Sequence, residues 1–364
     1  MTVLLTVVTP DVAQLQRRAR KLLPPHVYDY YAGGSGRERT LRASEKAWRH
    51  FWLAPRVLRD VSSADTATRL LGSTFATPLA VAPTGYQGLA YPDGELAAAA
   101  GAARAGALYV LSTRSTCRIE DVGETVAAEG GTWWFQVYLM RNRDLTAGLV
   151  RRAAAAGAAA LVLTADTPVV GRKRRNSADG VVSDEVFLVN LGPLDDLDAA
   201  SQAADVSLAD IGWLRDVGGG LPVVVKGVLR GDDAAACRAH GAAAVLVSNH
   251  GGRQLDGALP AALALPDVAG ALASGAGQEN CEVYADGGIR TGEDALAALA
   301  LGAGAVFLGR PALWALTCDG ADGVRSLLEG LTDDLAHAMA LAGATSMAGT
   351  AGIARPDPAR SQPR

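Results

Sequence analysis

Cysteine is scarce in this 364-residue chain, and no two of its four cysteines form a Cys-x-x-Cys pair. This spacing predicts neither a disulfide framework nor a zinc site, and it is typical of reduced thiols in a cytoplasmic protein. The sequence also lacks any run approaching the ~20 apolar residues of a membrane span. Its apolar start, MTVLLTVVTP, has no basic segment and no small-residue cleavage site, so we expect no signal peptide. The cysteines are Cys117, Cys237, Cys281 and Cys318.

Positive charge is not in excess either. Lys and Arg number 34 against 38 Asp and Glu, which gives a net charge of −4 and no basic stripe of the kind that binds nucleic acid. Hydrophobic residues make up 49% of the chain, enough for a large core. Length alone favours two domains, but α/β barrels of this size fold as single units.

The first part of the chain predicts helices and a hairpin. Residues 9–32 have helical character in two pieces, the second opened by Pro24-Pro25. Leu70-Leu71-Gly72 indicates a small hairpin. We therefore expect residues 1–76 to pack as a helical segment with a hairpin on the domain that follows. At the other end, the prolines of residues 351–364 predict a disordered tail.

From residue 78, apolar runs recur, and each is followed by an Ala/Leu/Arg-rich segment with helical spacing. The runs cover residues 78–85, 107–113, 132–138, 159–166, 222–227, 243–250, 281–288 and 305–310. Alternation of strand and helix favours parallel pairing, and eight units close a (β/α)8 barrel, here over residues 77–350. A doubly wound open sheet is the competitor, but no Gly-x-Gly-x-x-Gly follows the first run.

The connection after the fourth run is unusually long. Residues 171–206 contain no clear barrel element, and a loop of this length is commonly a lid or a binding loop. It starts with four basic residues, 172–175, which are equally compatible with a solvated charge run. A helix over 206–217 then precedes the fifth run.

Polar side chains and glycines collect where the runs end, which is where barrel enzymes place their active sites. The stretch SNHGGRQLD, residues 248–256, is the richest of these. It sets a titratable base, His250, beside Arg253, whose guanidinium grips carboxylates. The other positions at the ends of runs are Thr84, Gly85, Ser112, Gln136, Tyr138, Thr164, Asp166, Lys226, Asp286, Arg290, Gly309 and Arg310.

The last two units carry an anion-binding pattern. DGGIR at 286–290 and GRP at 309–311 each open a helix, and they combine glycine amides with two arginines. This pattern predicts a phosphate site. Lys226 adds a cation on the inner rim, although an ion pair within the barrel would explain it as well.

These stretches, in this order, resemble the FMN-dependent 2-hydroxy acid oxidases and dehydrogenases, a family that includes glycolate oxidase, lactate oxidase and mandelate dehydrogenase. The resemblance runs from about Val27 to Ala344. It rests on VKG (225–227), SNHGGRQLD, DGGIR and GRP, and also on VYDYYAGGSG (27–36), APTGYQGLAYPDGE (82–95), WFQVY (134–138) and LTADTP (163–168). The last hundred residues especially resemble the bacterial mandelate and 4-hydroxymandelate oxidase branch.

The resemblance implies a role for each matching residue. His250 is the expected catalytic base, Asp166 stabilises its imidazolium, and Tyr138 lies near the reacting hydroxyl. Arg253 and Tyr30 bind the substrate carboxylate. Lys226 is expected at the flavin edge that becomes negative on reduction. The residues expected to bind FMN are Pro83, Thr84, Gly85, Ser112, Gln136, Thr164, Lys226, Ser248, Asp286, Gly287, Gly288, Arg290, Gly309 and Arg310.

Three positions depart from the family pattern. Lys173 stands where the family has an arginine as a second carboxylate ligand, with Arg172 and Arg174 on either side. Arg114 stands where several members have an apolar pocket residue, and it would favour a polar or acidic substrate tail unless it turns outward. Gly85 stands where oxidases often have alanine and some dehydrogenases glycine, so the electron acceptor, oxygen or another, stays open.

The resemblance implies oxidation of an (S)-2-hydroxy acid by a homotetramer. Tyr86 and the Trp133-Trp134 pair favour an aryl substrate such as mandelate or 4-hydroxymandelate, ahead of a polar or acidic one. By alternation, only one of the two tryptophans can face the barrel interior. The alternatives are another FMN barrel, such as an isopentenyl-diphosphate isomerase, a flavin-free phosphate-sugar lyase or synthase, and a flavin-binding protein without catalysis.

Overall fold

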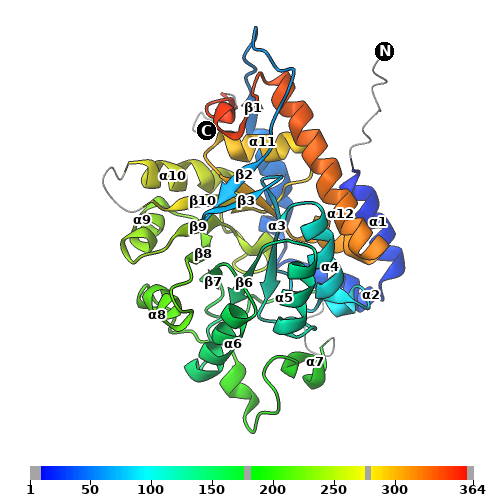
Figure 1. Cartoon of the computed structure of the whole chain (residues 1–364), viewed down its shortest axis with the longest axis vertical. Coiled ribbons are helices and arrows are strands. Elements are labelled where there is room, and N and C mark those ends of the chain that lie inside the picture. The colour runs from blue at the N-terminus through cyan, green and yellow to red at the C-terminus, as the bar shows by residue number, and fades with distance from the viewer. Residues whose placement is uncertain (1–9, 176–181, 275–279, 359–364) are drawn as a thin grey trace.

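The structure, a computed structural model, describes residues 10–175, 182–274 and 280–358. Within them, eight short parallel strands form a closed barrel in chain order, and β9 pairs with β10 in the same ring (Figure 1). The strands coincide with the eight predicted runs and confirm the (β/α)8 barrel. They are β4 (Leu79–Val81), β5 (Leu108–Ser112), β6 (Trp133–Val137), β7 (Leu161–Thr164), β8 (Val223–Val228), β9 (Ala244–Val247), β10 (Glu282–Asp286) and β11 (Ala305–Leu308).

A helix follows every barrel strand and packs outside it. These helices are α4 (Gly94–Arg104), α5 (Ile119–Ala128), α6 (Arg143–Ala155), α8 (Ala209–Val217), α9 (Gly231–Ala239), α10 (Ala261–Ala273), α11 (Gly292–Ala300) and α12 (Arg310–Leu341). Single 3-10 turns occur at η1 (Trp48–His50), η2 (Gln87–Leu89), η4 (His250–Gly252) and η5 (Met347–Thr350). The α12 helix is long but breaks at Gly320, whose φ is 58°.

Strand side chains alternate between the barrel interior and the helices, as period-two geometry requires. Trp134 faces inward and packs on Tyr284 and Phe307, with ring centroids 5.8 and 6.1 Å away. Trp133 belongs to the separate cluster beneath the helices. The prediction that only one tryptophan faces the interior is therefore confirmed.

The N-terminal region packs on the barrel, and α1 lies alongside α12 (Figure 1). Pro25 opens the second helix, as predicted, and the hairpin turns at Leu71-Gly72. Leu70 and Phe75 of the hairpin join the cluster inside the barrel. The elements are α1 (Val12–Leu22), α2 (Pro25–Ala32), α3 (Arg39–Ala47), β1 (Phe51–Leu53), β2 (Thr68–Leu70) and β3 (Ser73–Phe75).

The prediction of disorder from residue 351 is wrong for part of the tail. Residues 354–356 form β12 (Ala354–Pro356), which pairs antiparallel with β1. Pro356 stands at the strand's end, where its missing N–H costs no interior hydrogen bond. Residues 359–364 lie outside the described part of the chain.

The long connection after β7 contains two short elements, α7 (Asp184–Leu188) and η3 (Leu197–Ala200). An isolated bridge joins Lys173 to Ser35, so the start of the connection pairs with the N-terminal region. Residues 176–181 of the expected lid lie outside the described residues. Among the helices described, none is both long and apolar enough to cross a membrane.

Candidate active site

A cavity of about 760 Å³ opens over the carboxyl ends of the barrel strands. Most of the predicted site residues border it. Four do not, and they lie behind the residues that do: Gln136, Thr164, Asp166 and Ser248. Those that border it are Tyr30, Pro83, Thr84, Gly85, Ser112, Arg114, Tyr138, Lys173, Lys226, His250, Arg253, Asp286, Gly287, Gly288, Arg290, Gly309 and Arg310.

The backbone after β9 is left-handed at three consecutive residues, His250 to Gly252, with φ of 56°, 60° and 74°. For a histidine this conformation costs on the order of 1–3 kcal/mol, and such strain is commonly kept at functional sites. Two side chains hold the turn. Ser248 Oγ accepts from the His250 amide at 3.0 Å, and Asn249 Oδ1 accepts from the Gly252 amide at 3.3 Å. The turn places His250 on the cavity wall.

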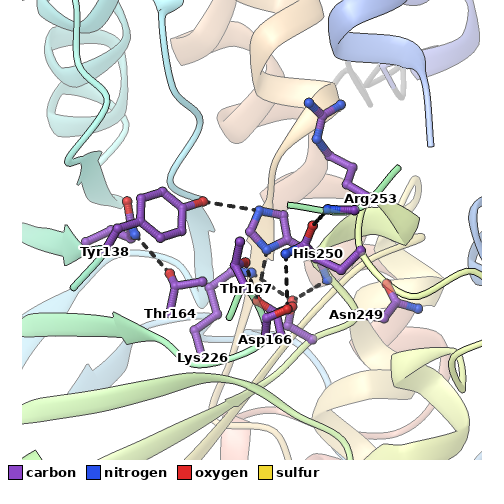
Figure 2. Close-up of polar contacts among 12 residues, drawn as sticks. Tyr138, Thr164, Asp166, Thr167, Lys226, Asn249, His250 and Arg253 are labelled. Carbon is purple, nitrogen blue, oxygen red and sulfur yellow. Dashed lines mark hydrogen bonds and ion pairs between the residues drawn. The ribbon is translucent and has the colours of Figure 1, made fainter. Parts of the chain in front are cut away.

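The His250 imidazole lies between a carboxylate and a phenol (Figure 2). Its Nδ1 is 3.0 Å from Asp166 Oδ1, and its Nε2 is 3.5 Å from the Tyr138 hydroxyl. Burial lowers the pKa of His250 more than the Asp166 carboxylate raises it. Burial raises the pKa of Asp166, but the charge and hydrogen bond of His250 outweigh that effect, and the pKa falls to about 2. At neutral pH His250 is therefore a neutral base beside an ionised carboxylate.

A layer of buried polar side chains lies beneath the cavity. Lys226 Nζ donates to Ser248 Oγ at 2.8 Å and is 3.4 Å from Asp286 Oδ2. On the other side of the barrel, Gln136 accepts from Ser112 Oγ at 3.1 Å and donates to Thr164 Oγ1 at 2.9 Å. These bonds fix where the functional groups point, so the floor of the cavity is preorganised.

Gly227 makes room for the carboxylate that holds His250. Its φ is 108°, and a Cβ there would lie 2.5 Å from Asp166 Cβ. Any larger residue would therefore displace Asp166. The VKG motif thus combines a cation for the floor with a close approach between β8 and the loop after β7.

Two cations and a tyrosine form one side of the cavity. Arg253 Nη1 donates to the main-chain oxygens of Tyr30, Tyr31 and Gly33 at 2.7, 3.2 and 3.1 Å, so the C-terminus of α2 holds the guanidinium. Its Cζ lies 5.2 Å from the centroid of the Tyr30 ring. Lys173 Nζ lies 5.6 Å from the Tyr30 ring centroid. Burial, with the charges of Arg253 and Arg310, lowers the pKa of Lys173 to about 7.

Arg290 and Arg310 come together at the cavity edge, as the anion-binding pattern predicted. Arg290 Nη2 is 2.6 Å from Glu45 Oε1. Arg310 donates to the main-chain oxygens of Tyr31, Gly251 and Gly33 at 3.0, 2.9 and 3.0 Å, which the sequence did not indicate. Burial, followed by the charges of Arg253 and Arg290, lowers the pKa of Arg310 to about 9. This edge holds excess positive charge, which suits an anion.

The structure adds residues that the sequence did not indicate. Leu41, Ser44 and Glu45 reach the cavity from α3, while Phe187 and Gln202 come from the long connection. The apolar run Val186-Phe187-Leu188 was the one available signal, because it stands out in a polar connection. For the α3 residues no signal was available, since only the packing of the helix against the barrel brings them there.

Comparisons with known proteins agree with this geometry. The pattern of the FMN-dependent dehydrogenase family matches residues 19–352. The chain is 41% identical over 349 residues to 4-hydroxymandelate oxidase of Amycolatopsis orientalis, covering 93% of this chain and 95% of that protein. It is 40% identical over 353 residues to L-lactate oxidase of Nostoc sp., covering 93% and 95%.

Solved structures give the same result. A crystal structure of mandelate oxidase superposes with a TM-score of 0.86 at 41% identity, covering 95% of this chain and 97% of that one. A mandelate oxidase variant with (S)-mandelic acid superposes with a TM-score of 0.85 at 40% identity, with coverage of 95% and 97%. The likeness therefore extends over the barrel and the N-terminal region together.

Proposed function

The chain belongs to the FMN-dependent dehydrogenase family, and from this premise we propose that it oxidises an (S)-2-hydroxy acid to the 2-oxo acid with FMN as cofactor. The observation that carries the proposal is His250. Its neutral imidazole borders the cavity, and Asp166 holds its Nδ1. Oxidation of a hydroxy acid requires such a base together with a cationic grip on the carboxylate. Arg253 and Lys173 border the same cavity and supply the grip.

The cavity fits FMN by the chemistry of its lining. Asp286 Oδ1 is buried without a hydrogen-bond partner in the described residues, as suits a carboxylate that accepts from a ligand hydroxyl. A Cβ at Gly309 would meet nothing nearer than 3.9 Å, and one at Gly287 nothing nearer than 3.5 Å. Both glycines leave open space at the edge where Arg290 and Arg310 lie, so a phosphate has room among the cations.

We assign the phosphate to that edge, including Gly288, and the flavin ring to the strand ends that carry Pro83, Thr84, Gly85, Ser112 and Lys226. Gln136, Thr164 and Ser248 support the ring's ligands from behind. When bound, FMN supplies the acceptor for two electrons. Lys226, which borders the cavity, would lie at the edge of the flavin and would favour the negative charge that develops there on reduction.

The chain's own groups handle the proton and the carboxylate. Arg253, Lys173 and Tyr30 orient the substrate carboxylate. The planar guanidinium of Arg253 suits a carboxylate that binds through two hydrogen bonds. His250 Nε2 takes a proton from the substrate, and the ionised Asp166 stabilises the imidazolium. The Tyr138 hydroxyl, 3.5 Å from Nε2, donates a hydrogen bond at the reacting centre.

For the side chain of the substrate, the aromatic walls of the cavity favour an aryl group. Tyr30, Tyr86, Tyr138 and Phe187 all border it. Relatives named mandelate and 4-hydroxymandelate oxidase support the same assignment. A mandelate-sized substrate would bury a phenyl ring, worth roughly 1.5–3 kcal/mol over a small aliphatic acid such as lactate.

Anaerobic flavin bleaching tests the proposed function. The purified holoenzyme is mixed without oxygen with (S)-mandelate, lactate, glycolate or 2-hydroxyglutarate, and loss of the visible flavin absorbance is followed in time. We expect bleaching, with mandelate faster than lactate or glycolate. A flavin that no hydroxy acid bleaches would point instead to a different FMN barrel enzyme, and a colourless protein would exclude a flavoenzyme. Mass analysis of the released cofactor distinguishes FMN from FAD.

Three finer properties are also part of the proposal. The four cysteines are free, which fits a cytoplasmic protein. The family resemblance supports a homotetramer, which light scattering tests. The oxidase names of the relatives support oxygen as the electron acceptor. To test that choice, the rate of oxygen consumption is compared with the rate of reduction of an artificial dye at the same substrate concentration.

A further inference from the structure

Arg114 is a cation in the cavity wall, and it has no acidic partner among the residues that the structure describes. It follows β5, and its Nη2 donates to the Ala200 carbonyl at 3.0 Å. Its Cζ lies 4.3 Å from the centroid of the Phe187 ring. These contacts hold the guanidinium in place but leave Nε and Nη1 without a hydrogen bond in the described residues. Burial lowers the pKa of Arg114, and the groups that counter this are tyrosines, Tyr86 first, rather than carboxylates.

Neighbouring arginines are different. Arg118, four residues along, is mostly exposed and lies 3.6 Å from Glu120. Arg143 and Arg152, in α6, also pair with acidic side chains. A desolvated charge is costly unless it is paired, and none of the described acidic side chains pairs with Arg114. The free-energy cost of burying the Arg114 charge is offset only when a bound ligand supplies an acceptor atom.

Two further groups mark the same wall as incomplete. Gln202 borders the cavity two residues beyond Ala200, and its Oε1 is buried with no partner in the described residues. Gly85 leaves space for the arginine, since a Cβ there would lie 3.1 Å from Arg114 Cβ and 3.2 Å from its carbonyl oxygen. The wall thus combines free donors, a free acceptor and room for the guanidinium.

The barrel order places this wall across from the catalytic base. His250 and Arg253 follow β9, whereas Arg114 follows β5, and the two strands are four apart in a ring of eight. A substrate whose carboxylate binds Arg253 and Lys173 therefore directs its side chain toward the opposite rim. Arg114 is positioned to meet the far end of that side chain.

We propose that Arg114 determines specificity by binding an acceptor oxygen, anionic by preference, at the end of the substrate's side chain remote from the 2-hydroxy carboxylate. The proposal rests on the proposed function and narrows it. Such an oxygen has two sources, the second carboxylate of an acidic aliphatic hydroxy acid or the ring hydroxyl of an aryl one. Both place an oxygen where the guanidinium has free donors.

Two matched substrate pairs test the proposal by anaerobic stopped-flow reduction of the holoenzyme. 2-Hydroxyglutarate and 2-hydroxypentanoate share a five-carbon chain and differ in the terminal group, carboxylate against methyl. 4-Hydroxymandelate and mandelate differ only in the ring hydroxyl. The acidic member of the first pair should have the higher second-order rate constant by about 10- to 150-fold, the value of one charge-assisted hydrogen bond. The second pair should differ by about 2- to 10-fold, as for a neutral acceptor.

Variants tie the preference to the arginine. Arg114→Met should remove the advantage of the oxygen-bearing member in both pairs. It should also raise the second-order rate constants for mandelate and 2-hydroxypentanoate. Arg114→Lys keeps the charge and should retain part of the preference for 2-hydroxyglutarate. Arg118→Met, in the same connection but outside the cavity, should leave all four rate constants unchanged. Whichever of 2-hydroxyglutarate and 4-hydroxymandelate has the higher second-order rate constant identifies the source of the oxygen.

A binding measurement separates this proposal from the proposed function. Perturbation of the flavin spectrum by 2-oxoglutarate and by 2-oxopentanoate gives dissociation constants that require no turnover. If no hydroxy acid reduces the flavin but 2-oxoglutarate still binds more tightly through Arg114, the function is wrong and the subsite stands. Equal reduction or binding within each pair, or a preference that survives Arg114→Met, overturns the subsite.

Discussion

The two ends of the barrel interior are built from the same strands but have opposite chemistry. At one end, Trp134, Tyr284 and Phe307 fill the interior with aromatic rings, and the β2–β3 hairpin joins them through Leu70 and Phe75. Two residues further along the strands, the inward positions are polar. They are Ser112, Gln136, Thr164, Lys226, Ser248 and Asp286.

The difference shows how one fold separates stability from catalysis. The apolar end satisfies its contacts within the chain. The polar end holds buried atoms with no partner in the described residues, Asp166 Oδ2 and Asp286 Oδ1, and a histidine in a left-handed conformation. Unsatisfied groups and strain both cost free energy, so the polar end is stabilised by what it binds, whereas the apolar end is stable by itself.

Replacing the base gives the largest expected effect at the polar end. His250→Ala should bind FMN and fold, yet flavin reduction by substrate should slow by about 10²–10⁴-fold, because general-base catalysis is lost. Stopped-flow reduction measures the rate, and circular dichroism with flavin content checks the fold. Flavin reduction at the wild-type rate would remove His250 from the mechanism.

The apolar end should respond in the opposite way. Trp134→Ala removes a large buried side chain and should lower the free energy of unfolding by about 3–5 kcal/mol. Denaturant unfolding measures this loss. The protein that remains folded should be reduced by substrate at the wild-type rate constant. If Trp134→Ala slows reduction as much as His250→Ala, the two ends are not separable.

The pattern along the strands allowed the polar end to be predicted. Apolar runs that end in polar residues predict a barrel with its site at the carboxyl ends, and alternation showed that only one of Trp133 and Trp134 can face the interior, whereas which of them does so came from the structure. Gln136 and Thr164 were expected to touch the flavin, and this stays a prediction. In the structure they do not border the cavity, but Gln136 bonds both to Thr164 and to Ser112, which does border it.

Contacts between segments far apart in the chain could not be predicted from the sequence. The bonds from Arg310 to the oxygens of α2 depend on how that helix packs on the barrel. Pairing of β12 with β1 joins residues 354–356 to residues 51–53 through backbone groups, which carry no side-chain signal. Phe187 reaches Arg114 through a connection that has no strand or helix period to follow.

Cofactor retention is expected to change less than the rate. Arg310→Ala removes a cation from the phosphate edge and should weaken FMN binding by about 10- to 150-fold, as for one charge-assisted hydrogen bond. Equilibrium dialysis against FMN measures it, with Arg230→Ala, an exposed arginine paired with Asp232, as the control. Since Arg310 also holds α2, Arg310→Lys serves as a second variant. Unchanged FMN affinity in both would place the phosphate elsewhere.

The smallest effect concerns pH and follows from the departure at Lys173. Its pKa of about 7 means that the free enzyme loses this cation as the pH rises through neutrality. Arg253 borders the same cavity and still binds the carboxylate, so substrate binding weakens without being lost. A charge-assisted hydrogen bond exceeds a neutral one by about 1–1.5 kcal/mol, which predicts a fall of about tenfold in kcat/KM to an alkaline plateau.

The acid limb has the opposite sign, because His250 acts as a base. As the pH falls through the lowered pKa of His250, the imidazole is protonated and kcat/KM declines. The profile should therefore have its maximum below neutrality, with an acid limb that keeps falling and an alkaline limb that levels off at a plateau. Bound substrate carboxylate raises the pKa of Lys173, so kcat itself should stay level on the alkaline side while KM rises.

Lys173→Arg should remove the alkaline decline and keep the acid limb, whereas Lys21→Arg, exposed on α1, should change neither. An alkaline decline that persists in Lys173→Arg would show that a group other than Lys173 causes it. The pH response of the polar end would then arise only on the side of the cavity where His250 lies.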